Sequence, residues 1–268
     1  MRANPLPEVR KPAVAGLFYP GDPASLAREV QQLLAGARRD AKSPPKALIA
    51  PHAGYVYSGP IAATAYALLE PVRDTVQRVV LLGPTHRVAV RGLALPRATR
   101  FATPLGAVEI DAEAVERLKT LPQVVTSDEA HALEHSLEVH VPFLQTVLEE
   151  FKLVPLAVGH ADPEEVARVI DALWGGPETL IVVSSDLSHY LDYRTAQRTD
   201  RATCDAILQL RSDLDHDHAC GATPVSGLAI AARRRGLKPE LVDLRNSGDT
   251  AGDKSRVVGY ASFALYEP

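Results

Sequence analysis

The sequence predicts an α/β fold in which a mostly parallel central sheet is flanked by helices. Short apolar runs alternate with segments of helical periodicity along nearly the whole chain, the pattern of strands joined by crossover helices. The chain has 268 residues, of which 46% are hydrophobic, so it can bury one large core. Neither a linker nor an internal repeat interrupts the pattern. We therefore expect a single domain over residues 1–268.

The first elements are a surface helix, a buried strand and a second helix. Residues 22–40 carry apolar residues on one helical face, with Asp22 in the N-cap position and Pro23 at the first helical position. Residues 47–50 form a short apolar run, which is typical of a buried strand. Residues 61–70 are rich in alanine and leucine and indicate a helix.

The middle of the chain continues the alternation, with one irregular stretch. Residues 79–83 indicate a second buried strand that ends in Gly and Pro. Residues 92–96 and 108–110 are short apolar runs bounded by proline and glycine, so we expect a small β excursion there. Helical periodicity then returns in residues 111–121 and 138–151.

The last part of the chain ends in the sheet. Its strands are apolar runs rich in β-branched residues, and its helices carry alanine, leucine and charged residues at helical spacing. The predicted order is strand 153–159, helix 162–174, strand 179–184, helices 201–210 and 227–235, strand 240–244, polar turn 246–253 and strand 257–266.

The composition limits the partners and the compartment. The net charge of −4 and the pI of about 6.1 give no overall basic footprint, so we expect neither nucleic acid nor anionic membranes as partners. No apolar stretch approaches the roughly 18 residues that span a bilayer, and the first residues lack the apolar centre of a secretory signal. We expect a cytoplasmic protein that binds a small molecule. In that compartment Cys204 and Cys220 are expected to be free thiols.

Polar motifs follow three of the predicted strands. PHAG follows residues 47–50, GPTH overlaps the end of 79–83, and SSDLSH follows 179–184. Ligands of open α/β sheets bind beyond the carboxyl ends of the strands, so His52, His86 and His189 are expected to converge. Two imidazoles with one anionic ligand hold non-haem iron or catalytic zinc. A histidine after a strand can equally be an ordinary hydrogen-bonded residue, and these alternatives stay open on spacing alone.

Two further motifs offer reactive groups. Asp186 and His189 are close together in SSDLSH, which suits an acid/base pair, although Asp186 can also be a helix N-cap. Cys220 in HACGATP can be a soft metal ligand, a nucleophile or a buried inert thiol. Cys204 lies in a helical pattern and is expected to pack in the core.

The string EAHALEHSLEVH at 129–140 concentrates three histidines and three glutamates. On a helix, His131 and His135, or His135 and Glu138, share one face and could form a local metal pair. A supporting role is the alternative, in which a carboxylate such as Glu138 orients a histidine and His140 lines the pocket. The string can also be a polar helix start, with Glu134 or Ser136 as cap.

Several familiar signatures are absent. The sequence contains no H-E-x-x-H, C-x-x-C, phosphate-binding G-x-x-x-x-G-K or G-x-S-x-G motif. The sequence therefore gives no support to a zinc protease, a zinc ribbon, a P-loop nucleotide site or a serine hydrolase elbow.

Taken together, the motifs resemble the Memo family, which includes protein B of the AmmeMemoRadiSam system. The strings RKPAVAGLFYP, PHAGYVYSG, GPTH, EHSLEVHVPFL, SSDLSHY and CGATP occur in that family's order and span nearly the whole chain. The family's fold is similar to that of class III extradiol dioxygenases, non-haem iron enzymes that open catechol rings. The resemblance implies that fold here.

The resemblance also implies roles for particular residues. It assigns one metal ion, iron or copper with zinc as a further option, to His52, His86 and Cys220. It gives the acid/base position to His189, with Asp186 beside it. The expected pocket residues around this site are Tyr55, His135, Glu138 and His140. Cys220 stands where the dioxygenases have a glutamate, and a thiolate favours copper, zinc or a differently poised iron.

Three functions follow from these expectations. The first is redox or oxygenase-like chemistry on a small substrate. The second is a non-catalytic protein that binds a metal or a partner's peptide in the same pocket. The third is zinc-dependent hydrolysis with His189 as the base. The sequence names neither the substrate nor the oligomeric state.

Overall fold

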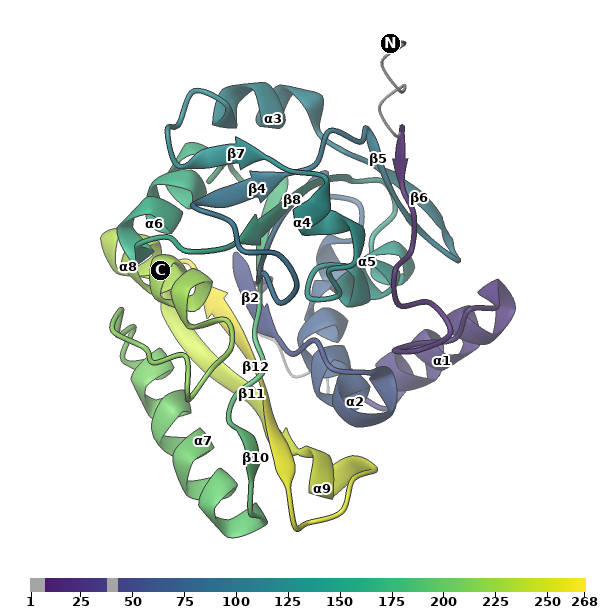
Figure 1. Cartoon of the computed structure of the whole chain (residues 1–268), viewed down its shortest axis with the longest axis vertical. Coiled ribbons are helices and arrows are strands. Elements are labelled where there is room, and N and C mark those ends of the chain that lie inside the picture. Colours follow the sequence, from purple (N-terminus) through teal and green to yellow (C-terminus); the bar gives the residue numbers. More distant parts are fainter. Residues whose placement is uncertain (1–7, 38–42) are drawn as a thin grey trace.

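The computed structural model describes residues 8–37 and 43–268, and its centre is a large mixed sheet (Figure 1). Within those ranges the sheet has nine strands in the order β10-β12-β2-β9-β3-β8-β4-β7, with β11 paired to the other edge of β12. The strands are β2 (Ala47–Ala50), β3 (Arg78–Pro84), β4 (Leu93–Leu95), β7 (Val124–Thr126), β8 (Lys152–Val158), β9 (Thr179–Ser184), β10 (His189–Leu191), β11 (Lys238–Asn246) and β12 (Val257–Tyr266).

The four central strands run parallel, which confirms the predicted fold class. β2 pairs with β9, β9 with β3 and β3 with β8, all in parallel register. The sheet becomes mixed toward both sides, where β12 is antiparallel to β2 and β4 is antiparallel to β8. The central strands are buried along nearly their whole length, as expected when helices cover both faces of a parallel sheet.

Helices cover the two faces in separate groups (Figure 1). Leu48 packs into one core cluster and Ile49 into the other, because successive strand residues point to opposite faces. The first cluster lies under α1 (Pro23–Ala35), α2 (Tyr55–Tyr66) and α5 (Val141–Val147). The second lies under α3 (Ala112–Leu118), α6 (Pro163–Ala172), α7 (Tyr193–Leu208) and α8 (Ala222–Arg235).

The start of the first helix agrees with the sequence prediction. The side chain of Asp22 accepts a hydrogen bond from the backbone N–H of Ser25 at 2.8 Å, and Pro23 occupies the first turn of α1. The described part of this helix ends at Ala35, and residues 38–40 of the predicted helix lie outside the described residues.

The predicted β excursion is split between two sheets. Residues 93–95 join the main sheet as β4, whereas residue 108 lies in a separate sheet of order β1-β5-β6. This sheet consists of β1 (Val9–Arg10), β5 (Arg100–Thr103) and β6 (Gly106–Glu109). The N-terminal segment thus crosses to a strand some 90 residues away in sequence, a pairing that local pattern does not encode.

Several predicted helix boundaries were wrong. The helix expected at 201–210 begins at Tyr193, and the helix expected at 227–235 begins at Ala222. The helix expected at 61–70 begins at residue 55 and becomes a 3₁₀ helix over η1 (Ala67–Val72). The helix expected at 138–151 is divided into η2 (Glu138–His140) and α5, which ends at Val147. Two short helices complete the fold: α4 (Glu129–Ala132) and α9 (Ser247–Thr250). The second of these stands in the predicted polar turn.

None of the helices in the described part of the chain is long and apolar enough to cross a membrane.

Candidate metal centre

Two histidine-bearing loops meet at the carboxyl edge of the parallel strands. β9 lies between β2 and β3 in the sheet, and β2 leads into Pro51 and His52 while β3 leads through Thr85 into His86. The loops therefore approach from either side of the end of β9. The imidazole rings of His52 and His86 have their centroids 5.1 Å apart. The convergence expected for these two histidines is present.

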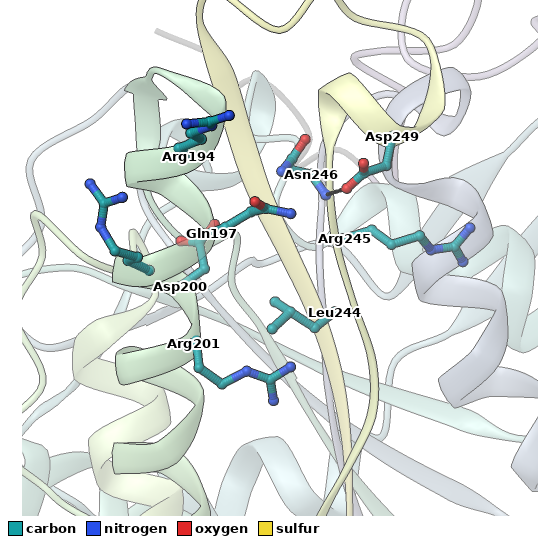
Figure 2. Close-up of a pocket in the computed structure, with 9 residues that line it drawn as sticks. Arg194, Gln197, Asp200, Arg201, Leu244, Arg245, Asn246 and Asp249 are labelled. Atoms are coloured by element: carbon teal, nitrogen blue, oxygen red, sulfur yellow. Dashed lines mark hydrogen bonds between the residues drawn. The ribbon is translucent and has the colours of Figure 1, made fainter.

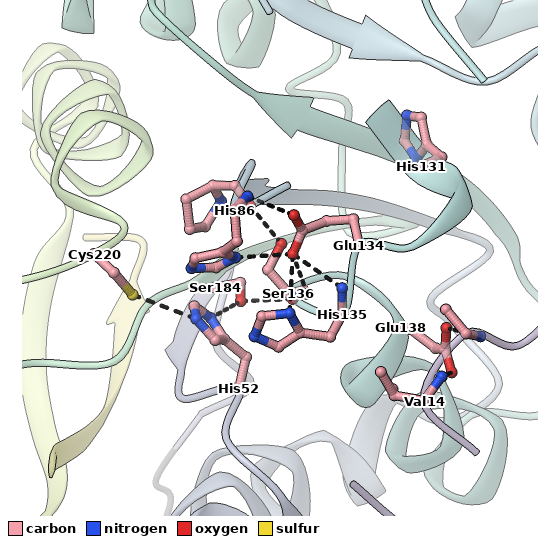
Figure 3. Close-up of polar contacts among 12 residues, drawn as sticks. Val14, His52, His86, His131, Glu134, His135, Ser136, Glu138, Ser184 and Cys220 are labelled. Atoms are coloured by element: carbon pink, nitrogen blue, oxygen red, sulfur yellow. Dashed lines mark hydrogen bonds and ion pairs between the residues drawn. The ribbon is translucent and has the colours of Figure 1, made fainter. Parts of the chain in front are cut away.

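Cys220 reaches the same place from the start of α8 (Figure 3). Its Sγ lies 3.3 Å from Nε2 of His52 and 3.3 Å from the backbone N of Asp186. One ligand atom each from His52, His86 and Cys220 lies within 4.8 Å of the others. A Cβ on Gly221 would stand 2.4 Å from the carbonyl oxygen of Ser184, so only glycine lets the cysteine loop close on the end of β9.

The hydrogen bonds of Ser184 define the protonation of His52. The Ser184 hydroxyl donates its single proton to the carbonyl of Ser136 at 2.7 Å, so it can only accept from its two other neighbours. These are Nδ1 of His52 at 2.6 Å and Nε2 of His140 at 2.8 Å. His52 therefore carries its proton on Nδ1 and presents the bare Nε2 to Cys220 and His86. The second nitrogen of His140 is satisfied by Tyr66, whose hydroxyl donates to Nδ1 at 2.8 Å.

Glu134 holds His86 in the same tautomer. Oε1 of Glu134 lies 2.8 Å from Nδ1 of His86, and Oε2 accepts the backbone N–H of His86 at 2.6 Å. Oε1 also accepts the backbone N–H groups of His135 and Ser136. Burial favours the neutral acid, but the contacts with His86 and these N–H groups outweigh it and hold the pKa of Glu134 at about 2. The carboxylate thus fixes the His86 proton on Nδ1 and leaves Nε2 free.

The segment that carries Glu134 is packed onto the end of β3. The Ser136 hydroxyl donates to the carbonyl of Pro84 at 2.7 Å. A Cβ on Gly83 would lie 2.8 Å from Ser136 Oγ, so the absence of a side chain there permits this approach.

The structure does not show the expected pairing of Asp186 with His189. Oδ1 of Asp186 accepts the backbone N–H of His52 at 2.7 Å, and Oδ2 lies 3.9 Å from Nε2 of that residue. Burial raises the pKa of Asp186 to about 7, although the His52 N–H opposes the rise. His189 begins β10 and is exposed by its surface area, although partial desolvation by the surrounding protein, followed by the charge of His86, lowers its pKa.

The other residues expected near the pocket have different surroundings. The ring of His135 stands 4.6 Å from that of His86 and 5.4 Å from that of His52, so it borders the cluster. His140 lies behind Ser184, as described above. Tyr55 is buried in the core, where its hydroxyl donates to the carbonyl of Val139 at 2.7 Å and its ring packs on Phe143.

Glu138 lies away from the histidines (Figure 3). Its buried carboxylate forms an ion pair with Arg10 and accepts hydrogen bonds from the Tyr19 hydroxyl and from the backbone N–H groups of Ala13 and Val14. The carboxylate that orients a histidine is therefore Glu134 instead of Glu138. The sequence pattern suggests Glu134 only as a helix cap.

Burial keeps the thiol of Cys220 protonated as long as no cation lies beside it. Desolvation, with the neighbouring Asp186 carboxylate as the second cause, raises the pKa of Cys220 to about 12. Burial, followed by the surrounding histidines, lowers the pKa of His52 well below its ordinary value. The site therefore combines a bare imidazole nitrogen with a thiol that needs a nearby cation to ionise.

Comparisons with known proteins agree with the sequence motifs. A family model described as Memo-like protein matches residues 10–264. The chain is 38% identical to a MEMO1 family protein of Aquifex aeolicus, over 94% of this chain and 97% of that protein. It is 37% identical to a MEMO1 family protein of Methanothermobacter thermautotrophicus, over 94% of this chain and 99% of the relative.

A solved structure shares the fold at low sequence identity. It is an uncharacterized protein of Escherichia coli K12, with a TM-score of 0.53, 16% identity, and coverage of 81% of this chain and 98% of that chain. The match over residues 10–264 and the two relatives near full length establish the family. The chain belongs to the family of Memo-like proteins.

Proposed function

We propose that this protein binds one transition-metal ion through Nε2 of His52, Nε2 of His86 and Sγ of Cys220. The observation that carries the proposal is the set of three unprotonated or ionisable donor atoms that face one another within 4.8 Å. Metal–nitrogen bonds of about 2.0 Å and metal–sulfur bonds of about 2.3 Å, at tetrahedral angles, put nitrogen and sulfur about 3.5 Å apart. The 3.3 Å between Nε2 of His52 and Sγ of Cys220 fits that requirement.

A second group of donors fits less well. His86, Glu134 and His135 also lie within 4.8 Å of one another. However, Oε1 of Glu134 already accepts hydrogen bonds from Nδ1 of His86 and from two backbone N–H groups. A metal bound to that oxygen would displace these bonds. The set with Cys220 leaves them intact and gives Glu134 an orienting role.

The donor set favours iron or copper. A thiolate with two imidazoles is softer than the two-histidine, one-carboxylate set, and it suits copper, zinc and iron above calcium, magnesium or manganese. Three protein ligands leave room for a further ligand on the exposed side of His86, whose side chain is 29% exposed. When bound, iron or copper supplies one-electron redox chemistry at that position.

Two residues of the chain would handle protons beside the metal. His189 is the first residue of β10, just beyond the loop that follows β9, and its exposed side chain can exchange a proton with a small substrate. The Asp186 carboxylate holds the backbone of His52 through its N–H and so positions that ligand. We therefore propose redox or oxygenase-like chemistry on a small molecule as the activity of this centre.

The metal content of purified variants tests the proposal. Wild-type protein loaded anaerobically with iron(II) or copper(I) and desalted should retain about one ion per chain. His52→Ala and His86→Ala should retain little, whereas His216→Ala, an exposed histidine, should behave as wild type. Retention of a full equivalent by both His52→Ala and His86→Ala would refute the proposed ligand set.

The role of His189 has its own readout. His189→Gln should keep the metal but slow oxygen uptake by the loaded protein in the presence of ascorbate. An unchanged rate would remove His189 from the proposed chemistry. Zinc-loaded protein is the control for this assay, since zinc has no redox activity and should give no oxygen uptake.

A further inference from the structure

A cleft opens between α7 and β11, apart from the metal centre (Figure 2). Its volume is about 670 Å³. One wall comes from α7 with Arg194, Gln197 and Arg201, and the opposite wall comes from β11 with Leu244 and Asn246. In Figure 2 the amide of Gln197 extends across the cleft toward Asn246.

The α7 wall is strongly cationic. Arg194, Arg198 and Arg201 all line the cleft, and their spacing places them on one face of the helix. Like charges four residues apart on a helix repel one another by roughly 0.2–0.5 kcal/mol. In the described part of the chain, none of the three forms an ion pair with a carboxylate, and Arg198 donates a hydrogen bond to the hydroxyl of Thr195.

The acidic residues of the cleft already have partners. Asp249 accepts hydrogen bonds from the Tyr193 hydroxyl and from the backbone N–H of Asn246. Asp200 accepts the backbone N–H of Ser188 at 3.0 Å. Arg245 is paired with Asp243, so we do not count it as an available cation. The charge left without a counterpart is that of the α7 arginines.

This cationic cleft contrasts with the rest of the chain. The whole chain has a net charge of −4. The larger cleft of about 1010 Å³, at the starts of β3 and β8, has more carboxylates than cations in its lining, including Glu109, Glu113 and Glu149. A concentration of unpaired arginines in one cleft of an acidic protein is therefore a local feature, and guanidinium groups are well suited to phosphate and carboxylate ligands.

We propose that the cleft between α7 and β11 binds a small polyanion that carries two neighbouring phosphate or carboxylate groups, as a diphosphate does. Arg194 and Arg201 are seven residues apart, which is about 10 Å along the helix. Their long side chains can contact two anionic groups from opposite ends, with the Gln197 amide between them. Asn246 offers a polar contact from the other wall, and Leu244 provides apolar surface.

The cleft is separate from the proposed metal centre. None of His52, His86 and Cys220 is among the residues that line it. Asp200 lines the cleft and, through its bond to Ser188, contacts the backbone just before His189. Failure of the polyanion proposal would therefore leave the metal proposal untouched, and the reverse also holds.

Titration calorimetry of the full chain with inorganic pyrophosphate tests the proposal. Wild type should bind in a 1:1 ratio, and the double variant Arg194→Ala/Arg201→Ala should bind at least about tenfold more weakly, because each lost charge-assisted contact costs affinity. Arg168→Ala is the matched control, since Arg168 is an exposed arginine on α6 and is not among the residues that line the cleft. Wild type and double variant are compared at equal metal content, because pyrophosphate also chelates metal ions.

A further variant keeps the test decisive if the double variant folds poorly. Gln197 is exposed, so Gln197→Glu should fold normally while it adds a negative charge to the middle of the cleft. We expect it to weaken pyrophosphate binding by a similar factor. Unchanged affinity in both variants, or no binding by wild type at millimolar pyrophosphate, would overturn the proposal.

Discussion

Oε1 of Glu134 lies 2.8 Å from Nδ1 of His86, and the same carboxylate accepts the backbone N–H of that histidine. One buried side chain therefore sets both the ring orientation and the loop position of His86. The bare Nε2 that results is the donor which the proposed metal centre requires. Consequences of this and of three other contacts can be measured.

Removal of the Glu134 charge should weaken metal binding. Glu134→Gln keeps the shape of the side chain but replaces one acceptor oxygen by an amide donor, which cannot accept the bonds that Oε1 accepts. We expect about a 10–100-fold loss of metal affinity, measured by competition with a chelator of known affinity. Glu129→Gln, an exposed change in the same segment, is the control. Equal affinities for wild type and Glu134→Gln would contradict the orienting role.

Ser184 should matter for stability even without metal. Its hydroxyl accepts from Nδ1 of His52 and Nε2 of His140, so Ser184→Ala leaves two buried donors without an acceptor. We expect the free energy of unfolding of the metal-free protein to fall by about 1–3 kcal/mol, as measured by urea denaturation. Ser255→Ala, at an exposed loop position, should change little. A loss no larger than that of Ser255→Ala would show that these bonds contribute nothing.

The buried ion pair between Arg10 and Glu138 should hold the N-terminal segment in place. Arg10 also donates to the carbonyl groups of His131 and Glu134, so it ties this segment to the one that carries Glu134. Arg10→Met leaves the buried carboxylate without its cation and should cost about 3–5 kcal/mol of unfolding free energy. Arg28→Met on the exposed face of α1 is the control. Similar stabilities for these two variants would contradict this assignment.

His131 should make stability depend on pH in the acidic range. Burial lowers the pKa of His131 from 6.5 to about 4. Because the folded pKa lies below the unfolded one, the unfolded chain binds the proton first, and this contribution to stability is lost as the pH falls from about 6.5 to about 4. The window corresponds to about 3 kcal/mol for this group. In denaturation curves over that range, His131→Gln should show a shallower pH slope, and parallel slopes would refute the assignment.

The strand-end histidines could be predicted because their position depends on local pattern. Residues 47–50 and 79–83 are short apolar runs with a histidine immediately beyond each, and parallel strands bring their carboxyl ends together. The pattern of a histidine after each strand does not predict Cys220, because this residue comes from the start of a helix in a different part of the chain. Its motif left a metal ligand, a nucleophile and an inert thiol open for Cys220, and only the family resemblance grouped it with the two histidines.

The partners of the two key carboxylates could not be predicted. Glu134 and Glu138 occur in one polar string, and helical spacing favoured Glu138. In the structure, Glu134 lies in a turn between α4 and η2, where helical spacing does not apply. Glu138 forms an ion pair with Arg10, which is 128 residues away in sequence. Such long-range pairings depend on tertiary packing, which one sequence does not reveal.

X-ray absorption of the protein loaded with one equivalent of copper(I) tests the central claim most directly. The account predicts one sulfur scatterer at about 2.3 Å with histidine nitrogens at about 2.0 Å. The sulfur shell should vanish in Cys220→Ser and persist in Cys204→Ala, since Cys204 is a buried thiol on α7. A spectrum of wild type without sulfur, or a sulfur shell that survives in Cys220→Ser, would contradict the claim that Cys220 binds the metal with His52 and His86.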